Sequence, residues 1–114
     1  MLVVNLAYKP SAILKEDIGQ IVCILRNEVA RAIGEADPKN AISPTAVTIN
    51  YNETDRCKQD ISIVVRTTYT EERCKKLDET AKAISEMMAH VVPGVLNSVY
   101  LRLIHASYHE SICK

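Results

Sequence analysis

The stretch Ile61-Ser62-Ile63-Val64-Val65-Arg66-Thr67 carries the clearest strand signal in the sequence. Four of its seven residues are isoleucine or valine, and β-branched side chains favour extended backbone. Shortly after it, Thr70 can cap the start of a helix, and Glu71 and Glu72 suit the positive end of the helix dipole. The sequence therefore predicts a strand that leads directly into a helix.

The predicted helix continues to the pair Pro93-Gly94, which ends it. Its apolar positions recur three or four residues apart, which is the spacing of one helix face: Leu77, Ala81, Ile84, Met88 and Val91. Residues 98–106 then alternate between apolar and polar side chains, as a half-buried strand does. The second half of the chain is thus predicted to be a β-α-β unit.

The first half of the chain repeats this order. Residues 2–8 form a short apolar strand, and a helix is predicted from Lys15 to the break at Asp37-Pro38. The apolar stripe of that helix is Ile18, Val22, Leu25, Val29, Ala32, Ile33 and Ala36. Residues 46–51 alternate as a strand, and residues 52–56 are predicted to form a loop.

The two halves also match in their letters. Residues 30–35 correspond to residues 81–86, and residues 47–51 correspond to residues 99–103 at nearly the same offset. We therefore expect one domain over 1–114, with pseudo-repeat halves of about 1–56 and 57–114. The expected fold is α+β, with a four-stranded mixed sheet and two helices on one of its faces. A ferredoxin-like arrangement has the same element order and is the alternative.

The sheet face opposite the helices is predicted to be half apolar and half polar. If the more apolar side of each strand faces the helices, the open face receives Val3, Asn5, Ala7, Ala46, Thr48, Asn50, Ser62, Val64, Arg66, Tyr100, Arg102 and Ile104. Such a mixture favours burial against another subunit. The other interpretation is an ordinary hydrated face with scattered aliphatic side chains.

Composition narrows the classes of function. Fourteen Lys and Arg balance fourteen Asp and Glu, and Trp and Phe are absent, which argues against nucleic-acid binding. The apolar run of residues 1–7 is too short for a signal peptide or a membrane span. The four cysteines contain no Cys-x-x-Cys pair. We therefore expect a cytoplasmic protein with reduced thiols and no membrane partner.

The doubled β-α-β order, with a strand at the very start, resembles the tautomerase superfamily. This superfamily includes 4-oxalocrotonate tautomerase, macrophage migration inhibitory factor and 5-carboxymethyl-2-hydroxymuconate isomerase. Residues 60–67 and 80–86 most resemble the last of these branches. The resemblance implies a homotrimer whose sheets pack around a three-fold axis, and this assembly would bury the open face.

The resemblance fails at the family's catalytic residue. Those enzymes use an amino-terminal proline as the base, whereas position 2 here is Leu2 and the nearest proline is Pro10. Methionine removal requires a small second residue, so we expect Met1 to stay. Its primary amine is the candidate base. The alternative is that Met1 is a structural or frayed end of the chain.

Other residues are candidates for binding. Arg66 and Arg102 on the open face are assigned to a substrate carboxylate, as the resemblance implies, or to an inter-subunit partner. Lys39 lies where some members of the family keep a cationic residue, and the alternative is a hydrated loop lysine.

No metal or cofactor is expected. His105, His109 and Cys113 are residue types that can bind zinc, but no Cys-x-x-Cys or His-Glu-x-x-His spacing supports a zinc site. Nucleotide cofactors are not expected, because the three glycines form no Gly-x-Gly-x-x-Gly motif.

Three functions remain open at this point. The chain is a tautomerase-like protein that binds a small carboxylate or keto acid without proline-dependent activity, an isomerase that uses the Met1 amine, or a ferredoxin-like ligand-sensing module. We favour the first, as a homotrimer.

Overall fold

The computed structural model describes residues 1–56 and 58–105. Its strands and longer helices are β1 (Leu2–Tyr8), α1 (Ile18–Ala36), β2 (Val47–Glu53), β3 (Ile61–Thr68), α2 (Glu71–Lys75), α3 (Leu77–Val91) and β4 (Asn97–Ile104). Short 3-10 turns lie at Lys15–Asp17, Pro38–Asn40 and Pro44–Ala46. None of the helices described is long and apolar enough to cross a membrane.

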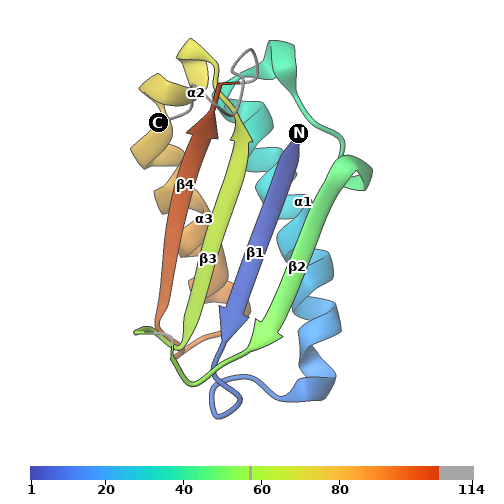
Figure 1. Ribbon diagram of the computed structural model, residues 1–114, viewed down its shortest axis with the longest axis vertical. Helices are drawn as coiled ribbons and strands as arrows, with labels where there is room; N and C mark the ends of the chain where they lie inside the picture. The colour runs from blue at the N-terminus through green and yellow to red at the C-terminus, as the bar shows by residue number, and fades with distance from the viewer. Residues whose placement is uncertain (57, 106–114) are drawn as a thin grey trace.

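The four strands form one mixed sheet in the order β2-β1-β3-β4 (Figure 1). β1 is parallel to β2, β3 is parallel to β4, and the two central strands β1 and β3 are antiparallel. The predicted mixed sheet is confirmed. The ferredoxin-like alternative is wrong, because a split β-α-β unit would place another strand between β1 and β2.

The helices cover one face of the sheet, as predicted (Figure 1). β1 and β3 alternate strictly between buried and half-buried residues, because successive side chains point to opposite faces. The buried side chains meet the apolar stripes of the helices, among which Leu25, Val29, Ile33, Ile84 and Met88 are almost fully buried. The predicted helix faces are therefore correct, although Thr80 also lies buried on the second stripe.

The second helix is interrupted, which the sequence pattern did not indicate. Lys76 has φ −106° and ψ 19°, outside the helical region, and separates α2 from α3. The Lys76 N–H still bonds the Glu72 carbonyl, and the Thr80 hydroxyl donates to the Lys76 carbonyl at 2.8 Å. These bonds satisfy both backbone groups of Lys76 at the break.

Two predicted strand ends need correction. Ala46 belongs to a 3-10 turn and not to β2, because Ser43 caps Pro44–Ala46 by accepting a bond from the Thr45 N–H. β2 extends to Glu53, into the predicted loop, because its residues keep pairing with β1 as far as Tyr8. β4 ends at Ile104, and the predicted strand end at residue 106 lies outside the described residues.

Candidate functional site

The first residue of the chain is anchored beside the sheet. β1 begins at Leu2, which pairs with Val47 on one side and Thr67 on the other. The Thr67 hydroxyl donates a 2.7 Å hydrogen bond to the carbonyl of Met1. The Met1 carbonyl is therefore held by β3, whereas the residue as a whole is 57% exposed.

A pocket of about 400 Å³ lies at this end of the molecule. We call it the Met1 pocket. Its lining residues come from three places: the start of the chain before β1, the loop after α1, and the end of β3 together with α2. They are Met1, Lys39, Asn40, Ala41, Ile42, Thr68, Thr70 and Arg73. Its volume lies within the range of small-molecule sites. Three of these residues carry a positive group and none is acidic, so the Met1 pocket favours an anionic ligand.

Arg73 joins the elements that surround the Met1 pocket. One terminal nitrogen, Nη1, donates to the Thr68 carbonyl at 2.7 Å and approaches the Thr67 hydroxyl at 3.4 Å. The other, Nη2, donates to the Asn40 carbonyl at 2.6 Å. The side chain is 3% exposed, and within the described residues its Nε has no hydrogen-bond partner. Arg73 thus ties α2 to both the end of β3 and the loop after α1.

We expect Arg73→Met to lower the free energy of unfolding by about 2–4 kcal/mol, because the carbonyls of Thr68 and Asn40 lose a buried, charged donor. Urea denaturation at one protein concentration measures this loss. Lys75→Met in the same helix removes an exposed charge and is the matched control. Equal stability of the two variants would show that the bonds of Arg73 contribute nothing.

Asp37 is the buried acid next to the Met1 pocket, although it does not line it. Its carboxylate accepts a 2.9 Å hydrogen bond from the Asn40 amide. This bond, a second from the Thr70 hydroxyl and the nearby charge of Arg73 hold the pKa of the Asp37 carboxyl below its usual value. Asp37 therefore fixes the loop that carries Lys39.

The lowered pKa of Asp37 predicts a pH dependence of stability. A native pKa below the unfolded value of about 3.9 stabilises the fold above that pH, and this contribution disappears as the pH falls through the native pKa. We expect Asp37→Asn to be less stable than the parent at pH 7 and to lose less stability below about pH 4. Urea denaturation between pH 7 and pH 2.5 tests this, with Asp55→Asn as the exposed control. Parallel pH profiles for parent and Asp37→Asn would contradict it.

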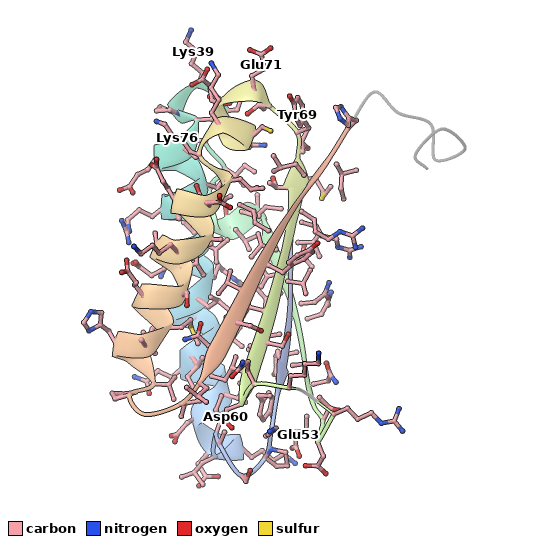
Figure 2. All side chains as sticks on the ribbon, turned by 90° about the vertical axis from the view of Figure 1, so that its left-hand side faces the viewer. Lys39, Glu53, Asp60, Tyr69, Glu71 and Lys76 are labelled. Atoms are coloured by element: carbon pink, nitrogen blue, oxygen red, sulfur yellow. The ribbon has the colours of Figure 1, made fainter. Side chains whose placement is uncertain are left out.

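Lys39 lies at the extreme end of the molecule in Figure 2, the same end at which Glu71 and Tyr69 lie. Glu53 and Asp60 lie at the opposite end of the sheet. Lys39 is exposed and lines the Met1 pocket, so the structure brings it together with Met1.

Arg66 and Arg102 do not line the Met1 pocket of a single chain. Both lie on the open sheet face, where the β3–β4 register places them directly opposite each other, and Arg66 also faces Val3 of β1. Arg66 is half-buried and Arg102 is exposed. The predicted membership of the open face is confirmed, apart from Ala46.

Other predicted candidates lie elsewhere. The His105 ring stacks on Tyr69, with 4.4 Å between the ring centroids. His109 and Cys113, the other members of the zinc set considered above, lie outside the described residues. The described part of the chain holds no cluster of three metal-ligating side chains.

Sequence reasoning missed Arg73 and Asp37, the two charged residues that build the Met1 pocket region. A signal for Arg73 was present, because it stands four residues before Leu77 and so falls on the apolar stripe of the second helix. A charged residue on a buried stripe requires hydrogen-bond partners. Asp37 was interpreted only as a helix breaker before Pro38.

The fold is similar to that of several solved structures. A member of the cis-3-chloroacrylic acid dehalogenase family gives a TM-score of 0.62 at 12% identity, over 98% of this chain and 81% of that one. A fused 4-OT asymmetric trimer gives 0.60 at 15% identity, over 98% and 94%. A domain of unknown function from Sebaldella termitidis gives 0.57 at 18% identity, over 96% and 95%.

These neighbours belong to the tautomerase superfamily. At such low identities the similarity establishes the fold, and the chain therefore has the tautomerase-like α+β fold that its sequence resembled. No protein-family model and no curated protein sequence matches the chain.

Proposed function

We propose that this chain is an oligomeric tautomerase-like protein that binds a small carboxylate or keto acid and lacks proline-dependent tautomerase activity. The observation that carries the proposal is the Met1 pocket. In a tautomerase-like fold, it combines the start of β1 with the Lys39 ammonium and contains no acidic lining residue.

The three positive groups of the Met1 pocket differ in how free they are to bind a ligand. Lys39 is exposed, and neither it nor the Met1 amine takes part in the ion pairs of the described residues, which involve Arg31 and Lys75. The terminal nitrogens of Arg73 donate to protein carbonyls, and its charge acts on the buried Asp37 carboxylate. A carboxylate is therefore proposed to bind Lys39 and the Met1 amine directly.

The open face supports the proposed assembly. It presents Tyr100, which is 65% exposed, together with Val3, Val64 and Ile104, and a second copy would remove these side chains from water. The similar 4-OT structures are trimers. Because Arg66 and Arg102 lie outside the Met1 pocket of one copy, we propose that they meet a ligand only at a boundary between copies.

Light scattering tests the assembly. We expect the mass of a trimer for the parent and a shift toward the monomer for Tyr100→Glu, because a charge on the open face opposes its burial. Leu14→Glu is the matched control, since Leu14 is 61% exposed and lies on the other side of the molecule from this face. A concentration-independent monomer for the parent, both with and without added phosphate, would refute the assembly.

Calorimetric titration with phenylpyruvate tests the ligand. We expect binding by the parent and an affinity weakened by about tenfold or more in Lys39→Gln, which loses a charged hydrogen bond. Lys82→Gln removes an equal charge from the exposed side of α3 and should bind as the parent does. Unchanged affinity in Lys39→Gln would place the ligand elsewhere.

The second candidate function is an isomerase that uses the Met1 amine as its base. The bond from the Thr67 hydroxyl to the Met1 carbonyl favours it, because a general base must be held in position. The activity measurement in the Discussion separates the two functions.

A further inference from the structure

Two arginines lie side by side on the open sheet face. Arg66 of β3 and Arg102 of β4 are direct partners in the parallel register. The other open-face positions of the four strands contain no acidic residue: Val3, Asn5, Ala7, Thr48, Asn50, Asn52, Ser62, Val64, Thr68, Ser98, Tyr100 and Ile104. The face therefore carries two positive charges and no side chain that neutralises them.

The arginine pair is not neutralised from elsewhere in the same chain. The ion pairs of the described residues involve Arg31 and Lys75, and neither open-face arginine. The Nε of Arg66 is buried and has no hydrogen-bond partner among those residues. Like charges directly opposite each other in a sheet are destabilising. In the single chain, solvent around the exposed Arg102 screens this repulsion.

Burial of the open face against further copies would remove that water. The charges of Arg66 and Arg102 in each copy would then lie at a low-dielectric interface. The same interface would contain Tyr100, Val64 and Val3. Glu53 of β2 and Asp60 before β3 do not meet this need. The strand register places Glu53 opposite Tyr8, at the far end of β1 from the Val3 that faces Arg66, and Asp60 lies at the same end as Glu53 (Figure 2). The Asp60 carboxylate is also used within the chain, where it accepts a hydrogen bond from the Leu96 N–H at 3.0 Å.

We infer that a small oxyanion of the phosphate class binds between Arg66 and Arg102 and links the assembly of this protein to the anion concentration. Two guanidinium groups present planar pairs of donors that match the oxygens of such an anion. The inference rests on the proposed assembly through the open face. It concerns a site separate from the Met1 pocket, whose lining excludes both arginines.

Sedimentation velocity of the full chain with added sodium phosphate tests the inference, with sodium chloride holding the ionic strength constant. If the oligomer binds the anion and the monomer does not, a phosphate concentration ten times the anion's dissociation constant tightens association about tenfold for each anion bound. We expect this dependence in the parent and in Lys82→Gln. We expect it to be absent in Arg102→Gln, which should associate without phosphate because the repulsion is relieved.

The outcomes separate the two proposals. An oligomer whose mass does not depend on phosphate would overturn the anion site and leave the assembly standing, since a carboxylate of the neighbouring copy would then neutralise the arginines. A monomer under all conditions would refute the assembly itself. Phosphate dependence that persists in both Arg66→Gln and Arg102→Gln would place the anion elsewhere.

Discussion

Leu25→Asp and Ile84→Asp are each expected to abolish cooperative unfolding of the chain. Leu25 has no exposed surface and Ile84 is 1% exposed, and they lie on the stripes of α1 and α3 that face the sheet. A carboxylate at either position loses its hydration and gains no partner, which costs about 4–5 kcal/mol or more. This loss is comparable with the ~5–15 kcal/mol that stabilises an ordinary domain.

Circular dichroism during thermal melting measures the effect. Asn27→Asp in α1 and Ala83→Asp in α3 introduce the same side chain at exposed positions of the same helices, and both should melt near the parent temperature. If Leu25→Asp or Ile84→Asp keeps the parent melting transition, the assignment of the helix faces is wrong.

The second large effect concerns proton transfer at the start of β1. The parent chain is expected to show no measurable phenylpyruvate tautomerase activity, because the resembled enzymes use a secondary prolyl amine and this chain presents Met1 followed by Leu2. General acid–base catalysis by a positioned group contributes about 10²–10⁴-fold. Activity should therefore rise by up to that factor when a proline amine is restored at the correct position.

The structure decides which variant restores the proline. Leu2 is 1% exposed and faces the helices, so Leu2→Pro would direct the ring into the core and remove a buried side chain. Met1 shares its side of the strand with Val3, which lies on the open face. Met1→Pro, expressed behind a removable initiator methionine, is thus expected to gain activity, whereas Leu2→Pro stays inactive and is destabilised by about 2–5 kcal/mol.

Turnover by the unaltered chain would contradict this prediction. If acetylation of its amino terminus abolished that turnover, the Met1 amine would be the base and the isomerase function would replace the proposed one. Turnover that survives acetylation would identify a base away from the Met1 amine.

The fold was predictable because both halves of the chain express the same pattern. Strand alternation around Ile63 and the helical stripe around Ile84 are local signals that agree with the tertiary packing, so element order and buried faces followed from them. The break at Lys76 was not predictable, because no proline or glycine interrupts that stripe. Three residues earlier, Arg73 bonds the Asn40 carbonyl, a contact that exists only in the folded chain.

The candidate site was predictable only in part. Met1 and Lys39 were named from the resemblance, and the structure places them in one pocket. The role of Arg73 depends on bonds to backbone carbonyls of Thr68 and Asn40, and a carbonyl acceptor leaves no trace in residue identity. The sequence placed Arg66 and Arg102 on one sheet face, but only the strand register shows that they are direct neighbours.

The central position of β1 has a consequence for synthesis of the chain. Its two neighbours are β2 and β3, and β3 begins only at Ile61. A nascent chain that has released residues 1–56 can complete β1-α1-β2, but one side of β1 then presents free backbone donors and acceptors. Until β3 leaves the ribosome, that side is open to pairing with another nascent chain, and the time that residues 57–68 take to emerge determines how long this exposure lasts.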